Sequence, residues 1–355
     1  MDSIQEYIDS LPDDIQIINV SNRDLTELPD LSRFKKLQEL YCHNNCLTSL
    51  PPLHFYLQKL NCSGNRLTSL PQLNYYLREL DCSINKLTSI PSLNYHLQKL
   101  NCVSNRLTSL PELNYHLREL DCCNNFLTML PTSGYFHLRK LNCSLNKLTF
   151  LPPLNYYLEE LFCSNNELTI LPTLNEQLRR LHCQSNLLTF LPELNENLQY
   201  LFCSFNMLSF LPKLNINLKV LHCSNNQLTY LPLLNKELVY IYCYKNKLLT
   251  LPNFNEKLES ICCYDNPIYK IINRNDNDIQ LVTDHSLKIL KQKVKTFNNF
   301  IFLYHCLKFK NQFRKWLWEL IREPKIINKF HPSYLNENLD DKDNLEDFLE
   351  KWITS

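Results

Sequence analysis

A run of twelve similar segments begins with Leu37-x-x-Leu40-x-Cys42-x-x-Asn45-x-Leu47 and ends at Ile268. The pattern returns every twenty residues, with a single twenty-one-residue step at the insertion of residues 132–134. Most copies continue into a Leu-Thr-x-Leu-Pro run, as at residues 47–51. A fixed period of this length indicates a solenoid, in which each unit packs only on its neighbours.

The pattern also predicts the structure of each unit. The L-x-x-L-x-C segment is expected to form a short strand, with Leu and Cys pointing inward and the residues between them facing out. The asparagine, from Asn45 to Asn266, is expected to satisfy backbone groups where the chain leaves the strand. The Leu-Pro run then forms an extended outer wall, because proline fixes the backbone and removes a hydrogen-bond donor.

The repeat resembles the leucine-rich repeat in its short form. The resemblance implies an α/β-type solenoid, a horseshoe with a parallel sheet on its concave face. We expect residues 1–14 to form a short N-terminal helical cap, because Ser3 and Glu6 have capping-box spacing before an apolar face. Residues 15–269 form the solenoid, with one degenerate and twelve full repeats, and residues 270–355 form a C-terminal helical cap or domain.

The cysteines are predicted to be structural. Twelve of the sixteen occupy the same slot of the repeat. Neighbouring rungs of a sheet lie about 4.8 Å apart, whereas the Cβ atoms of a disulfide approach to about 3.5 to 4.5 Å, so a ladder in register does not form disulfides. Reduced thiols behave as small buried apolar groups, and they fit a reducing compartment.

Composition excludes several classes of function. The net charge is +1, so no field of the whole molecule favours nucleic acid or anionic lipid. Only two glycines are present and alanine is absent. Glycine-rich phosphate loops, which need glycine at fixed spacing, are therefore missing. The N-terminus lacks a signal-peptide pattern, and no apolar run is long enough to span a membrane. We therefore predict a cytoplasmic protein without catalytic residues, cofactor, metal or small-molecule substrate.

Two kinds of residue face outward from the predicted strands. From Lys59 to Arg180, the residue before the second leucine of each strand alternates between positive and negative charge. This alternation indicates a scaffold whose charges neutralise each other. From residue 162 onward the outward slots hold aromatic residues, and the candidate partner-binding set is Phe162, His182, Tyr200, Phe202, Phe205, His222, Tyr240, Tyr242, Tyr244 and Tyr264. The alternatives are that the C-terminal domain covers these rings, or that they stack on one another.

A second set of aromatic residues recurs in the loops, at residues 75–76, 95–96, 115–116 and 156–157. Its regular spacing predicts ring stacking between repeats.

The C-terminal part is predicted to be helical over residues 278–322, with many basic residues, and to be followed by an acidic amphipathic helix at 340–352. A helical cap on the last repeat is the main interpretation. The alternative is an adaptor that binds nucleic acid or a membrane surface through the basic helices.

Two groups of proteins share the short repeat with its Leu-Pro step: secreted bacterial effectors and the repeat proteins of giant DNA viruses. The cysteine slot, the scarcity of glycine and alanine, and a tail running from Arg322 through His331-Pro332 to Trp352 are similar to the viral group, which implies the host cytoplasm. Some effectors are ubiquitin ligases with a C-x-D motif, and Cys263-Tyr264-Asp265 matches its letters. Cys263 lies in the buried slot, however, and too few residues follow it for that domain. The sequence thus favours a non-enzymatic module that binds a protein partner, with an unknown oligomeric state.

Overall fold

The computed structural model describes residues 4–133, 137–272 and 284–308. The chain divides into two compact units, Met1–Val294 and Lys295–Ser355. The predicted acidic helix at 340–352 and the tail that resembles viral proteins lie outside the described residues.

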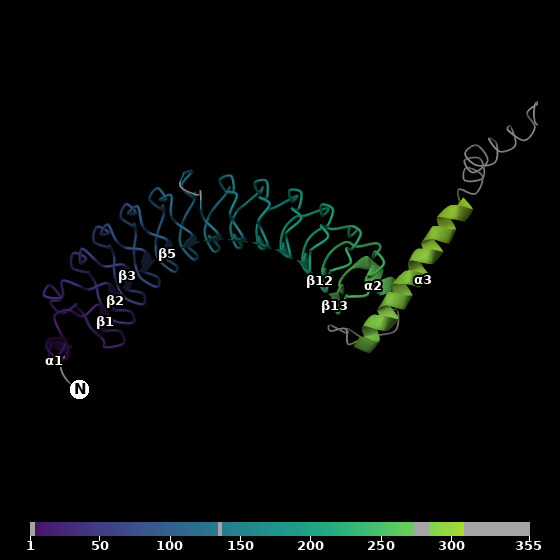
Figure 1. Ribbon diagram of the computed structural model, residues 1–355. Coiled ribbons are helices and arrows are strands. Elements are labelled where there is room, and N and C mark those ends of the chain that lie inside the picture. Colours follow the sequence, from purple (N-terminus) through teal and green to yellow (C-terminus); the bar gives the residue numbers. More distant parts are fainter. Residues whose placement is uncertain (1–3, 134–136, 273–283, 309–355) are drawn as a thin grey trace, which may run out of the picture. The chain divides into compact units, whose positions relative to one another are not determined.

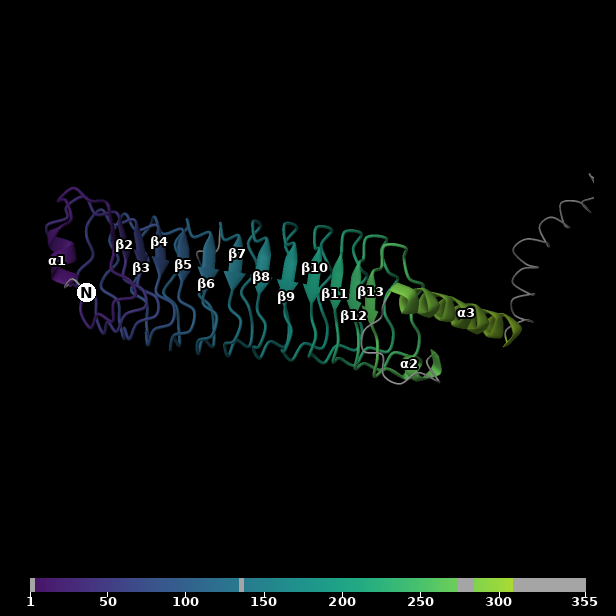
Figure 2. The ribbon, with the colours of Figure 1, turned by 90° about the horizontal axis from the view of Figure 1, so that it is seen from below.

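Thirteen strands of three residues each form a single parallel sheet in chain order. They are β1 (Ile17–Asn19), β2 (Glu39–Tyr41), β3 (Lys59–Asn61), β4 (Glu79–Asp81), β5 (Lys99–Asn101), β6 (Glu119–Asp121), β7 (Lys140–Asn142), β8 (Glu160–Phe162), β9 (Arg180–His182), β10 (Tyr200–Phe202), β11 (Val220–His222), β12 (Tyr240–Tyr242) and β13 (Ser260–Cys262). The strands line the inner side of a curved stack of rungs (Figure 1), and they lie side by side when the sheet is viewed face-on (Figure 2). The predicted solenoid with a concave parallel sheet is confirmed.

The register follows the sequence period. Leu60 pairs with Leu80, twenty residues later, whereas Leu120 pairs with Leu141 across the predicted insertion. The spacing between β1 and β2 is longer, since Ile18 pairs with Leu40, twenty-two residues later. The longer first repeat contains Phe34, whose side chain is fully buried. The sequence pattern identified the degenerate repeat but not its extra length.

Each rung buries the residues that define the pattern. In the third rung Leu60, Cys62 and Leu67 are at most 1% exposed. The strand ends early because the second residue after the cysteine adopts the left-handed conformation, with φ between 51° and 62° from Asn44 to Asp265. That residue bends the chain away from the sheet and starts the outer part of the rung.

A ladder of buried asparagines joins each rung to its neighbours, as predicted. The Asn65 amide donates to the carbonyl oxygens of Cys42 and Cys62, at 3.0 Å each. Its side-chain oxygen accepts from the backbone N–H of Leu47 at 3.0 Å. One amide therefore satisfies backbone groups of two rungs that would otherwise be buried without a partner.

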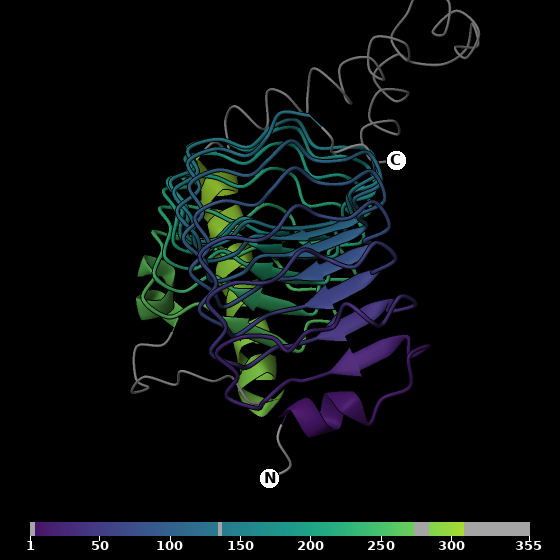
Figure 3. The ribbon, with the colours of Figure 1, turned by 90° about the vertical axis from the view of Figure 1, so that its left-hand side faces the viewer.

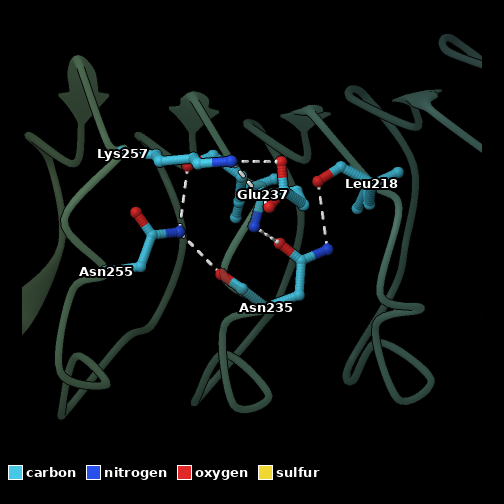
Figure 4. A network of polar contacts seen from close by, with 6 residues as sticks. Leu218, Asn235, Glu237, Asn255 and Lys257 are labelled. Carbon is cyan, nitrogen blue, oxygen red and sulfur yellow. Dashed lines mark hydrogen bonds and ion pairs between the residues drawn. The ribbon is translucent and has the colours of Figure 1, made fainter.

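A second asparagine ladder, which the sequence pattern did not single out, runs through the loops before the strands. Asn255 donates to the carbonyl oxygens of Asn235 at 2.6 Å and Leu238 at 3.0 Å. Figure 4 shows this ladder beside an ion pair in which Lys257 Nζ lies 2.6 Å from Glu237 Oε2. The signal was present in the sequence as the recurring asparagine after Leu-Pro-x-Leu.

Helix α3 (Asp284–Lys308) closes the open end of this second ladder. Lys291 Nζ donates to the carbonyl oxygens of Asn255 at 3.1 Å and Leu258 at 3.2 Å. These are the acceptors that the asparagine of a further rung would use, so the lysine replaces that missing asparagine. Leu287, Leu290 and Val294 are buried on the same helix. The beginning of α3 is therefore a cap for the last rung, as expected for the end of a solenoid.

Helix α1 (Ile4–Asp9) lies beside β1 at the N-terminal end of the stack (Figure 3). Its Ile8 is 1% exposed. The Arg33 guanidinium donates to the carbonyl oxygen of Ile8 at 2.6 Å and pairs with Asp13 at 2.8 Å. These contacts agree with a short helical cap. A further short helix, α2 (Pro267–Ile272), follows β13. The boundary predicted between residues 269 and 270 stays a prediction.

Candidate functional site

The concave face of the N-terminal half carries charges that pair with each other. Lys59 lies 3.2 Å from Glu79, and Lys99 lies 3.2 Å from Glu119. The pairing continues into β8 and β9, where Glu160 bridges Lys140 and Arg180 at 3.7 and 3.4 Å. These side chains are partly exposed, so each pair contributes about 0 to 1 kcal/mol. The pairs neutralise this half of the face, which agrees with the scaffold predicted for the alternating charges.

The C-terminal half of the same face carries a stack of five rings on consecutive strands, which we call the aromatic ladder. Its members are Phe162, His182, Phe202, His222 and Tyr242. Successive ring centroids lie 4.6, 4.1, 4.6 and 4.0 Å apart, with interplanar angles of 21° to 40°. Because the rings cover one another's faces, the ladder presents ring edges to a partner.

The two histidines of the ladder are neutral at physiological pH. Burial lowers the pKa of His182, and the nearby charge of Arg180 lowers it further. Burial lowers the pKa of His222 to about 4, with a smaller contribution from His182. The rings of the ladder are therefore uncharged, although the Glu160–Arg180 pair lies beside the first two of them on β8 and β9.

The structure separates the other predicted residues from this ladder. Tyr200 and Tyr240 lie two residues before the ladder rings of β10 and β12. The Arg180 guanidinium lies 5.0 Å from the centroid of the Tyr200 ring. Tyr244 and Tyr264 follow the strands and stack on each other at 4.7 Å. Phe205 occupies the left-handed turn position, with φ of 55°, and is 54% exposed. Five of the ten residues thus form one stack, and Phe205 stands apart from it because the strand has already ended.

Comparison with solved structures shows which repeat this is. YopM from Yersinia enterocolitica is 34% identical, with a TM-score of 0.70 over 72% of this chain, and the match spans 56% of the YopM chain. YopM from Yersinia pestis, described as a leucine-rich effector protein, is 28% identical, with a TM-score of 0.57 over 75% of this chain and 86% of its own.

InlJ from Listeria monocytogenes is 31% identical, with a TM-score of 0.58 over 70% of this chain and 58% of its own, and its functional domain includes a cysteine ladder. The chain has the leucine-rich repeat fold. No family model matches the sequence, and no curated protein matches it.

A cysteine ladder is also present in this leucine-rich repeat chain. All twelve cysteines of the repeat slot are buried and free, and some thiols donate to the next rung, as Cys163 Sγ does to the His182 carbonyl oxygen at 3.4 Å. Burial raises the pKa of every one of these thiols, to about 12 for Cys183 and Cys223. The ladder thiols therefore stay protonated, as the structural interpretation requires.

The C-x-D cysteine shares this setting. Cys263 is 2% exposed, and burial raises its pKa to about 12. A catalytic cysteine needs an exposed position and a lowered pKa. Cys263 has neither property, because the repeat buries it.

Two further classes of site find no support in the part of the chain that the structure describes. No group of three or more His, Cys, Asp and Glu side chains is arranged to hold a metal ion there. None of the described helices combines the length and apolar character that crossing a membrane requires.

The loop aromatics contact each other between repeats, but most of these contacts are not the stacks that their spacing predicted. Tyr75 lies 4.7 Å from His96, Tyr95 lies 4.4 Å from His116, and both pairs are nearly perpendicular. These contacts are edge-to-face rather than stacked, so they link rungs along the edge of the sheet and leave the tyrosines about half exposed.

Proposed function

We propose that this protein is a non-enzymatic interaction module that binds a protein partner on the concave face of its C-terminal half. The supporting observation is the change along that face from charges that pair with each other to the uncharged aromatic ladder. Tyrosine and other aromatic residues dominate interaction hot spots, because they bury a large area at a small entropy cost. Tyr200, Tyr240 and the Tyr244–Tyr264 pair extend the proposed surface on both sides of the ladder.

The geometry of the ladder favours a polypeptide over a nucleic acid on this face. Single-stranded nucleic acids bind by stacking bases on exposed ring faces. Here the faces of His182 and Phe202 are covered by neighbouring rings, and His222 is neutral. The adaptor that uses the basic C-terminal helices stays an alternative, and strongly salt-dependent retention of the full chain on nucleic acid or anionic vesicles would support it.

We further propose that the protein acts in a cytoplasm, which is a host cytoplasm if the chain is viral. The free, buried thiols of the cysteine ladder support a reducing compartment. The three solved neighbours described above are bacterial, and two of them are YopM proteins. The viral origin therefore rests on sequence resemblance, part of which lies in residues 322–352.

Substitutions that copy other rungs test the proposed surface. We expect the triple variant Phe202→Asn, Tyr242→Asn and Tyr244→Ser to bind its partner at least about a hundredfold more weakly, since each lost aromatic anchor costs about 1 kcal/mol or more. Asn61 and Ser63 hold the equivalent slots of β3 and its turn, so the new residues suit the rung. The measurement is the dissociation constant, by calorimetry, of the partner captured with the wild-type chain.

The matched control for this variant is Tyr75→Glu in the loops, which installs the residue found at Glu176. It is expected to leave the dissociation constant unchanged. If the triple variant keeps both the circular dichroism spectrum and the affinity of the wild-type chain, the proposed surface is not the binding site.

A further inference from the structure

The outer wall of the solenoid carries a row of side chains whose character changes along the chain. The second residue before the proline of each Leu-Pro step is serine in four successive rungs, at Ser49, Ser69, Ser89 and Ser109. In the next six rungs it is large and apolar, and these residues, the outer-wall row, are Met129, Phe150, Ile170, Phe190, Phe210 and Tyr230. Each of the six is 43% to 55% exposed.

Folding does not require the outer-wall row. The following leucine of the same run is buried, as at Leu171 and Leu191, and fills the core of the rung. The rungs that carry serine pair with the same register, although the leucine after the serine is only half-buried there, at Leu50, Leu70 and Leu110. In the six rungs of the row the neighbouring leucine is buried more fully, yet the large apolar side chains themselves remain about half exposed. An exposed apolar strip of this kind marks a contact surface.

The rings of this row are also unengaged, unlike those of the aromatic ladder. Within the described residues, no ring contact involves Phe150, Phe190, Phe210 or Tyr230. Three further apolar side chains widen the strip, since Phe126, Leu187 and Met207 are 42% to 48% exposed three residues before members of the row. Both the faces and the edges of the rings are thus available.

We propose that the outer-wall row is an interface between two copies of this chain. A large side chain offers about 150 to 250 Å² when fully exposed, so six half-exposed ones present roughly 500 to 700 Å². With the three flanking side chains, the strip reaches the roughly 800 Å² per partner of a specific interface. The row contains no charged residue, and homodimer interfaces are more apolar than interfaces between independent proteins.

The order of residues in the row suits a twofold axis. An axis midway between Ile170 and Phe190 places these two residues of opposite copies together and brings Phe150 of one copy to Phe210 of the other. Residues of similar size then meet on both sides of the axis. The net charge of +1 gives little repulsion between copies. Because this interface uses the outer wall, it leaves the concave face open.

Sedimentation equilibrium of the reduced full chain between about 1 and 100 µM tests this proposal. We expect a concentration-dependent rise from the chain mass of 42.3 kDa toward twice that mass. In the double variant Phe190→Ser and Phe210→Ser, which copies Ser89 and Ser109, the dissociation constant of the dimer should rise at least about a hundredfold. The circular dichroism spectrum of the monomeric variant should match that of the wild-type chain, which shows that the variant folds.

The concave-face variant Phe202→Asn is the control and should dimerise as the wild-type chain does. A wild-type chain that is monomeric at 100 µM overturns the proposal, as does a double variant that dimerises with unchanged affinity. Dimers that are lost in Phe202→Asn and kept in the double variant would place the interface on the concave face and also overturn it.

Discussion

We expect the solenoid to unfold cooperatively between about pH 9 and pH 11, under reducing conditions at room temperature. Burial raises the pKa of every ladder thiol in the folded chain, to about 12 at Cys143 and Cys183, against an ordinary value near 9.0 in the unfolded chain. A folded pKa above the unfolded one gives stability that is complete below pH 9 and is lost as the pH rises toward 12. In this pH range, each such thiol lowers the free energy of unfolding by about 1.4 kcal/mol per pH unit.

Twelve thiols titrating together make this effect large. Together they lower the free energy of unfolding by roughly 16 kcal/mol per pH unit. A typical folded protein has a free energy of unfolding of about 5 to 15 kcal/mol, so this loss exceeds it within about one unit above pH 9. The free energy of unfolding in urea, measured at pH 7, 8, 9 and 10, should be constant at first and then fall steeply.

A single Cys183→Val variant is the matched control. With one titrating group fewer, its free energy of unfolding should fall less steeply above pH 9, by about 1.4 kcal/mol per pH unit. An unfolding free energy at pH 10 equal to that at pH 8 would show that the ladder thiols are not buried as neutral groups.

The second large effect concerns the buried asparagine ladder. We expect Asn206→Ala to lower the free energy of unfolding by about 2 to 4 kcal/mol, because the backbone N–H of Leu188 loses its acceptor at 3.1 Å and becomes a buried donor without a partner. The Cys183 carbonyl also loses one of its two amide donors, keeping that of Asn186. Urea denaturation monitored by circular dichroism measures the loss.

Asn197→Ala gives a control in the preceding loop. Asn197 donates to the Glu176 carbonyl oxygen at 2.9 Å, but this contact is exposed, so its loss should cost less than about 1 kcal/mol. Equal losses in the two variants would contradict a special role for the buried ladder.

The sequence predicts most of the solenoid because each structural role is tied to one slot. Leu60, Cys62 and Asn65 recur with a fixed period, and a residue that repeats every rung must meet the same surroundings in each. The closure of the second ladder by Lys291 was not predictable in this way. It depends on where a helix places one amine relative to two carbonyls more than thirty residues away, and no repeat encodes that position.

The candidate site was predictable only in part. Strand alternation indicates that Phe202 and Tyr242 face outward, but it leaves open whether the rings stand free or stack on one another, and the structure shows that they stack. Ring packing depends on the spacing of rungs and on rotamers, which the pattern does not contain. The turn position of Phe205 shows a related limit, since the strand ends where the left-handed residue begins. The outer-wall row, in contrast, is visible in the sequence as a change from serine to large apolar residues in one slot.

Alkylation of the native chain, mapped residue by residue with mass spectrometry, tests most directly whether the rungs stack on a dry interior. With iodoacetamide at pH 7.5, the half-buried thiols of Cys46, Cys123 and Cys262 should react, while all twelve thiols of the cysteine ladder stay protected until urea unfolds the chain. Ladder thiols that react in the native protein as fast as Cys123 would contradict the stacked solenoid and the surfaces inferred from it.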